Sequence, residues 1–423
     1  MMFNKNLLNF SPKKKLFIFI LLYFVFIFFY SFIFNIDYYQ IWKLLGVPAK
    51  EYLFSDIYPF FVNEDCKIIS NNLRDYYEQF LNCDESKRTF NYMPLWLYVL
   101  KFGINNEYHY FFGFTLITLF YISFFKLIKI KSNADLILYA LIILSPPIML
   151  AIERGNSDLL IFFLCFISIY LLIKKNFFYN LLGYFLILFS SLIKFFPIFL
   201  ILIFFKKNSY NKFASFSVLF IFLIYIFFNI EDIFLIKKNT QETLFLSYGF
   251  NILEVSLKNF YDNLNILILA TKNYLYANNG TFKEVISEIL YIEDFKNNYF
   301  IISRCISIII IIFSVVYSFK NKNNEKILIN NNFYFFIAGA SIFCGTFLLG
   351  ANFDYRLIFL LLTVPYLIEQ KKNFIYLLIL YFWISPISIF TLGLDDILSW
   401  ILFIFFINYL STYYISLVLN KKS

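Results

Sequence analysis

The chain has 423 residues, of which 61% are hydrophobic and 24% aromatic, and its apolar residues come in long blocks. Blocks of about twenty apolar residues are long enough to cross a bilayer, so the composition indicates a membrane protein with several spans. The net charge of +9 does not indicate nucleic-acid binding, because the lysines form small clusters between the apolar blocks. Such clusters are typical of the cytoplasmic connections between membrane helices.

The spans should be α-helices. In hydrocarbon each backbone N–H and C=O group must find its partner within the segment, and the blocks lack the alternation of an outer-membrane barrel. We therefore expect an all-α polytopic membrane protein, a bundle of about twelve transmembrane helices that forms one domain over residues 1–423.

The first predicted span covers residues 16–34 and follows a lysine-bearing segment, residues 1–15, which should be cytoplasmic. Because no small-residue cleavage site follows, the sequence predicts a retained helix rather than a removed signal peptide. Residues 35–91 are mixed and acidic and should form a long first extracytoplasmic loop. Cys66 and Cys83 lie in this loop and could pair in an oxidising compartment.

The later spans alternate between lysine-rich ends and uncharged or acidic ends, which supports each crossing by the positive-inside rule and places both termini inside. They are predicted at residues 107–127, 135–152, 159–173, 177–190, 195–205, 213–228, 300–318, 333–350, 356–368, 374–390 and 397–419, with a short aromatic segment at 92–101 and a second long extracytoplasmic loop at 229–299.

Absent motifs narrow the possible chemistry. The sequence contains no GxxxxGK, GxGxxG, HExxH or GxSxG motif, and His109 is its only histidine, which excludes a histidine-based metal site and a Ser-His-Asp triad. The predicted cytoplasmic connections are too short for a nucleotide-binding domain. We expect no metal and no cofactor, and any chemistry should take place on the outer face.

Residues 153–158 form the tip of a predicted hairpin between two spans and carry three charges. Local structure can account for this polarity, because an Asn or Ser side chain can cap the next helix, Asp158 can complement its dipole, and Glu153 can pair with Arg154. The tip can equally be part of a site. Both interpretations are open at the level of the sequence.

Three cations, Arg154, Lys194 and Arg356, are predicted on the outer side, against the positive-inside bias. If they converge there, they would suit a phosphate or a pyrophosphate. Two nearby acids have structural alternatives: Asp56 could be a turn residue before a proline, and Asp354 could be a helix N-cap.

Several short motifs resemble those of the GT-C membrane glycosyltransferases. They are an acidic first external loop, Asn-Tyr-Met-Pro-Leu-Trp at 91–96, Arg-Gly-Asn-Ser-Asp at 154–158, Lys-Phe-Phe-Pro at 194–197 and Asp-Tyr-Arg at 354–356. Among these enzymes the chain is most similar to glycosyltransferase family 87, which depends on polyprenol-phosphate-mannose. The resemblance covers most of the chain in layout, although Met93 stands where the family usually has proline.

The resemblance implies an inverting hexosyltransferase of the plasma or inner membrane that moves a sugar, first of all mannose, from a polyprenyl-phosphate-linked donor to a glycan or glycolipid acceptor. It implies that Asp56 is the general base, with other acids left open as alternatives, namely Asp37, Asp65, Asp75, Asp84, Glu153 and Asp158. Arg154, Lys194 and Arg356 would bind the donor phosphate. The candidate substrate-binding residues are Tyr92, Glu153, Asn156, Asp158, Asn352, Asp354 and Tyr355.

Two other functions compete with this interpretation. A transporter or lipid flippase should carry ionisable residues near span centres and show two related halves, and the sequence shows neither. A polymerase or ligase that uses a diphosphate-linked lipid would also need outer-face cations. The type of donor would separate this enzyme from a monophosphate-dependent one.

Overall fold

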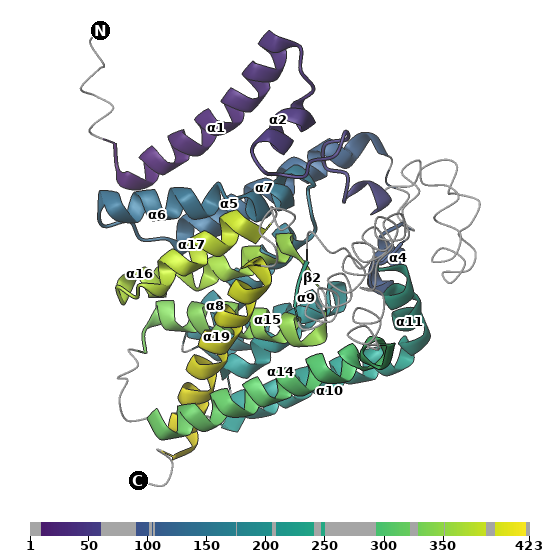
Figure 1. The fold of residues 1–423 in the computed structure, drawn as a ribbon, viewed down its shortest axis with the longest axis vertical. Coiled ribbons are helices and arrows are strands. Elements are labelled where there is room, and N and C mark those ends of the chain that lie inside the picture. Colours follow the sequence, from purple (N-terminus) through teal and green to yellow (C-terminus); the bar gives the residue numbers. More distant parts are fainter. Residues whose placement is uncertain are drawn as a thin grey trace, which may run out of the picture. The chain divides into compact units, whose positions relative to one another are not determined.

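The computed structural model describes residues 10–60, 90–100, 104, 106–174, 176–204, 209–240, 247–249, 293–321, 329–350, 352–385 and 394–419. In these ranges the ordered elements are helices, apart from one pair of two-residue strands (Figure 1). This confirms the predicted all-α class. Residues 61–89, with Cys66 and Cys83, and most of the predicted second loop lie outside the described residues.

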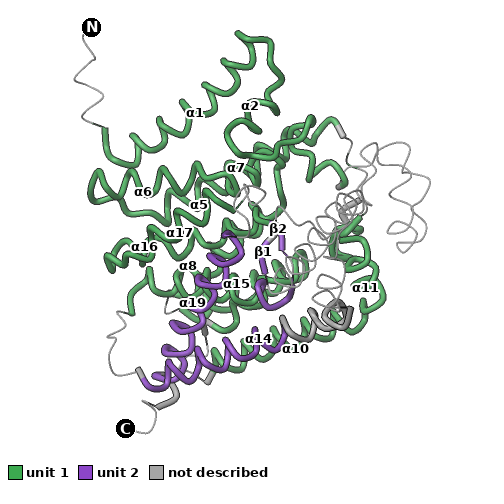
Figure 2. Tube along the Cα trace, in the orientation of Figure 1, with its two compact units in different colours: residues 1–241, 327–345, 354–387 green, residues 242–326, 346–353, 388–423 purple. Residues whose placement is uncertain are grey.

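The chain divides into two compact units (Figure 2). Unit 1 contains residues 1–241, 327–345 and 354–387, and unit 2 contains residues 242–326, 346–353 and 388–423. Every candidate site residue except Asn352 falls in unit 1, and Asp354 begins the last segment of that unit.

Unit 1 holds most of the helices, including the first fifteen residues of α15 (Asn331–Leu349). Its other elements are α1 (Pro12–Phe34), α2 (Tyr38–Leu44), η2 (Tyr58–Phe60), α4 (Pro94–Leu100), η4 (Asn106–Tyr108), α5 (His109–Leu127), α6 (Asn133–Ile143), α7 (Pro146–Glu153), α8 (Asp158–Ile173), α9 (Phe177–Ile193), η5 (Phe196–Phe204), α10 (Ser209–Phe228), α11 (Ile230–Asn239), η6 (Asp354–Leu362), α16 (Val364–Glu369) and α17 (Phe374–Ile384).

Helix α8 lies at the centre of unit 1. It is apolar on all sides, as expected of a helix surrounded by others, and it packs against α5, α9 and η6. The fully buried ring of Phe162 contacts Phe120 of α5 and Phe359 of η6, with ring centroids 5.2 Å and 6.1 Å away. The first polar residue of α8, Asp158, is therefore held inside this core.

The predicted span at 135–152 is wrong as a single helix, because α6 and α7 are bent by 54°. Pro146 and Pro147 lack the N–H groups that would continue the helical ladder. The carbonyl of Ile142, which Pro146 leaves free, accepts hydrogen bonds from the backbone N–H and the Oγ of Ser145 instead, at 3.1 Å and 2.6 Å.

Other predicted boundaries also changed. The span expected at 356–368 consists of η6 and α16, which meet at Thr363, just before Pro365. The segment at 195–205 is the 3-10 helix η5. Part of the loop expected at 229–299 is helical, since it contains α11 and the start of α14 (Glu293–Asn321).

Five helices among the described residues are long and apolar enough to cross a membrane, and the bent pair α6–α7 would make six. They are Pro12–Phe34, His109–Leu127, Tyr210–Phe228, Asn331–Leu349 and Leu394–Ser416. The protein is therefore a multi-pass membrane protein by helix length and composition. The number of about twelve spans stays a prediction.

Unit 2 is built on α14 and α19 (Leu394–Leu419), which pack together and are linked by a hydrogen bond of 2.9 Å from Ser318 Oγ to Asn408 Oδ1. Strands β1 (Ser247–Tyr248) and β2 (Asn352–Phe353) pair antiparallel, with Tyr248 opposite Asn352.

Candidate functional site

The segment that follows α2 reaches the 153–158 hairpin through its backbone. The amide of Phe54 donates to the carbonyl of Glu153 at 2.9 Å, and the amide of Asp56 donates to the carbonyl of Arg154 at 3.0 Å. Phe54 adopts a φ of +62° and is 2% exposed, and its ring lies over Gly113 of α5. These contacts hold Asp56 beside the hairpin.

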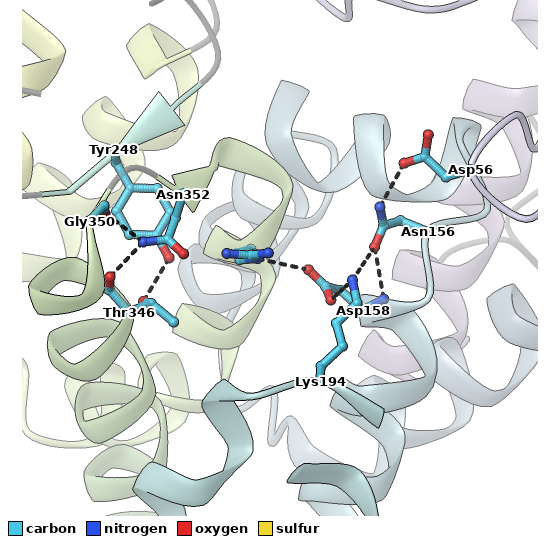
Figure 3. Close-up of polar contacts among 9 residues, drawn as sticks. Asp56, Asn156, Asp158, Lys194, Tyr248, Thr346, Gly350 and Asn352 are labelled. Atoms are coloured by element: carbon cyan, nitrogen blue, oxygen red, sulfur yellow. Dashed lines mark hydrogen bonds and ion pairs between the residues drawn. The ribbon is translucent and has the colours of Figure 1, made fainter. Parts of the chain in front are cut away.

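Asn156 joins the two segments through its side chain (Figure 3). Its Nδ2 donates to Asp56 Oδ2 at 2.7 Å, while its Oδ1 accepts from the backbone N–H of Asp158 at 2.9 Å and from Lys194 Nζ at 3.3 Å. The contact with Asp158 satisfies the first backbone N–H of α8, whereas the N-cap residue Ser157 makes no side-chain capping hydrogen bond. The same amide also contacts Asp56 and Lys194, so it does more than hold the start of the helix.

Asp158 binds both candidate cations of the neighbouring elements. Lys194 Nζ lies 2.5 Å from its Oδ1, and Arg356 Nε lies 3.8 Å from its Oδ2. The Asp158 side chain is fully buried, whereas the side chains of Lys194 and Arg356 are 10% and 24% exposed. Arg356 is therefore the more accessible of the two cations, and its guanidinium lies 5.5 Å from the Phe196 ring centroid.

Lys194 follows α9 as its C-terminal cap and is surrounded by aromatic rings. The ring centroids of Tyr92 and Tyr355 each lie 5.9 Å from its Nζ, within the range of a cation–π interaction. Trp96 of α4 donates from Nε1 to the carbonyl of Ile193 at 3.2 Å, which fixes α4 to the end of α9.

Burial lowers the pKa of the Lys194 ammonium from its usual 10.5, and the neighbouring Asp158 acts in the opposite direction. Two carboxylates, Asp56 and Asp158, stand against two cations, Lys194 and Arg356. We call these four residues and Asn156 the charged cluster. Its two positive and two negative charges balance, which offsets the cost of burying Asp158 and Lys194.

Asp56 is the only acid of the charged cluster that is partly exposed. Its Oδ2 is held by Asn156, and its carbonyl oxygen accepts from the Tyr92 hydroxyl at 3.0 Å. Among the described residues nothing hydrogen-bonds its Oδ1. A fixed carboxylate with one oxygen open to solvent is suited to accept a proton from a bound hydroxyl group.

Glu153 and Arg154 do not join the charged cluster. Glu153 is 1% exposed, and its Oε1 accepts from the backbone N–H of Lys50 at 3.2 Å. Arg154 donates from Nη2 to the carbonyl oxygen of Pro48 at 3.4 Å. The pairing of these two residues with the first segment was not foreseen, because nothing in the sequence relates 48–50 to 153–154.

The remaining predicted residues make contacts of a structural kind. Asn352, in unit 2, donates from Nδ2 to the carbonyls of Thr346 and Gly350, and the Thr346 hydroxyl lies 2.9 Å from the hydroxyl of Tyr248. Asp354 is buried at the start of η6. The contacts of Asn352 and Asp354 do not support the substrate-binding role predicted for them.

Fold and site together define a multi-pass α-helical membrane protein with a partly buried cluster of charged residues, two carboxylates and two cations. No family model, no curated protein and no solved structure matches the chain. Within the described ranges no three His, Cys, Asp or Glu side chains gather in a way that could hold a metal ion.

Proposed function

We propose that this protein is a GT-C-type glycosyltransferase that transfers a hexose from a polyprenyl-phosphate-linked donor to a glycan or glycolipid acceptor on the extracytoplasmic face of the membrane. The observation that carries the proposal is the position of Asp56. Its partly exposed carboxylate accepts a hydrogen bond from the Asn156 amide, which also accepts one from Lys194. A second cation, Arg356, lies close by, paired with Asp158. The sequence motifs that resemble glycosyltransferase family 87 support the same assignment.

Asp56 would act as the general base. In the reaction the acceptor oxygen forms a bond to the anomeric carbon of the sugar with inversion, the acceptor proton passes to the Asp56 carboxylate, and the bond between that carbon and the phosphate oxygen breaks. Asn156 keeps the carboxylate oriented through Oδ2 and leaves Oδ1 for the incoming proton. Polyprenyl phosphate leaves with the electron pair of the broken bond.

The leaving phosphate needs positive charge near it as its own charge grows. Arg356 is the first candidate for this contact, since it is the more exposed cation and its ion pair with Asp158 is the longer one, at 3.8 Å. Lys194 is bound closely to Asp158 and would act over a greater distance. The role of Arg154 toward phosphate stays a prediction from the sequence.

The test is sugar transfer from radiolabelled polyprenyl-phosphate sugars, mannose first, in membranes that contain equal amounts of wild type or variant. We expect Asp56→Asn to lower transfer by about 100-fold or more, because a positioned base contributes 10²–10⁴-fold in typical enzymes. Glu51→Gln is the matched control: Glu51 is an exposed carboxylate in the same external segment, five residues before Asp56, so the rate should not change.

Transfer that survives Asp56→Asn would refute the assignment of the base. Transfer from diphosphate-linked donors alone would identify the polymerase or ligase class. If the wild type transfers sugar from no donor of either class, the enzyme proposal fails and the transporter interpretation gains.

A further inference from the structure

Besides the bond from Asn156 to Asp56, four hydrogen bonds attach the external segment 48–56 to Glu153 and Arg154 of the hairpin. Two run from backbone amides of the segment to the carbonyls of these residues, and two involve their side chains. We call this set the loop clamp. It contains the hydrogen bonds of Phe54 and Asp56 to the hairpin backbone, of Lys50 to the Glu153 carboxyl, and of Arg154 to the Pro48 carbonyl.

The side chain of Glu153 is hidden from any substrate. The residue is 1% exposed, and the one hydrogen bond of its side chain among the described residues is the contact of Oε1 with the Lys50 amide. Its second oxygen, Oε2, is buried and has no hydrogen-bond partner in the part of the chain that the structure describes. A buried carboxyl costs free energy, so its presence at this position calls for a compensating role.

The residue after the clamp, Gly155, has no room for a side chain. Gly155 has a φ of +58°, and an added Cβ would lie 2.8 Å from Ile57 Cδ1 and 3.0 Å from Phe54 Cβ. The first segment therefore packs directly on the glycine backbone, one residue beyond the clamp. The position of Asp56 depends on both contacts.

We infer that Glu153 and Arg154 are positioning residues, which fix the external segment 48–56 on the hairpin so that Asp56 reaches Asn156, and that Glu153 does not contact the substrate. The loop clamp is a feature of the fold whatever the reaction is. Its consequence for catalysis rests on the proposed role of Asp56.

The first experiment is hydrogen–deuterium exchange on the full-length protein in detergent micelles, followed in peptides that cover residues 48–56. Glu153→Met fills a similar volume but cannot accept a hydrogen bond, so we expect exchange in these peptides to become at least tenfold faster, with α8 unchanged. Glu153→Gln keeps an acceptor oxygen and should exchange like the wild type. Glu51→Gln, at an exposed neighbouring carboxylate, is the control.

Unchanged exchange in Glu153→Met would overturn the inference. If that variant does not fold, Arg154→Met is measured in its place, since it removes the contact with Pro48 and leaves Glu153 intact. Faster exchange of residues 48–56 in Arg154→Met would support the clamp. Exchange at the wild-type rate in this variant would show that Arg154 does not hold the segment.

The second experiment uses sugar transfer. Glu153→Met should lower kcat at least tenfold with little change in donor KM, and Glu153→Gln should keep the wild-type rate within about threefold. Equal losses in both variants would make Glu153 itself an acid or base and refute the positioning role. If the wild type shows no transfer, the proposed function fails, while the exchange result still decides whether the clamp exists.

Discussion

At the level of single residues, the charged cluster places two cations beside the buried carboxylate of Asp158. Asp158 is fully buried, and its contact with Lys194 replaces the water that both ions lost. A buried pair of this kind adds little net stability compared with an apolar pair of similar size, yet removal of one partner leaves the other charge uncompensated. The conformation of the site therefore depends on the pair being complete.

We predict that Lys194→Met or Asp158→Leu alone destabilises the protein by about 3 to 5 kcal/mol, which is the usual cost of leaving one buried charge without its partner. The double variant Lys194→Met/Asp158→Leu should be more stable than either single one. Unfolding of the purified protein by dodecyl sulfate in mixed micelles measures this. If the double variant loses as much unfolding free energy as the two single variants lose together, the two residues are not energetically coupled and the prediction is wrong.

At the level of helices and turns, the site depends on irregular connections. Asp56 lies two residues after a position with positive φ, Asn156 lies in the turn after α7, Lys194 ends α9, and Arg356 lies in a 3-10 helix. Backbone outside regular helices is tolerated at membrane depth only where protein or water surrounds it. Such connections leave polar groups free to form the charged cluster.

We predict that Gly155→Ala displaces segment 48–56, because the new methyl group would overlap Phe54 and Ile57 and the residue would be strained at φ +58°. The expected result is faster hydrogen exchange in 48–57. Gly183→Ala is the matched control: its methyl group meets Leu172 between α8 and α9, so it can lower stability without changing exchange in this segment. Equal exchange in both variants would contradict the prediction.

At the level of the whole molecule, apolar helices and lysine clusters determine how the chain crosses the bilayer. Helix α1 exposes a nearly continuous apolar surface, with only 17% of its apolar stretch buried, as expected of a helix that faces lipid. Helix α15 is 78% buried by the same measure and is surrounded by protein. Both helices are strongly apolar, and they differ in their neighbours.

We predict the orientation of unit 1 from the positive-inside rule. In a background without the five native cysteines, Tyr52→Cys should react with a membrane-impermeant maleimide in intact cells. Lys131→Cys and Asn373→Cys, two exposed positions in lysine-bearing connections, should react only after permeabilisation. Labelling of Lys131→Cys in intact cells would place the charged cluster on the other face of the membrane from the one proposed.

Local composition is enough to specify the class of fold and the positions of most helices. Long apolar blocks can cross hydrocarbon only as helices, and this rule acts on each block separately. The ends of α1, α5 and α8 fall within a few residues of the predicted spans for this reason. The same pattern puts the polar residues at helix ends, which is why Asp56, Asn156, Lys194 and Arg356 stand out in the amino-acid sequence as candidates.

Which of these residues meet depends on how whole elements pack. Contacts between segments a hundred residues apart, such as Asp56 with Asn156, rest on packing that no local pattern encodes. The same applies to Arg154, which the charge pattern grouped with Lys194 and Arg356 but which donates to Pro48 in the first segment. Side-chain direction at a helix end depends on the neighbouring element, and that neighbour is a property of the fold.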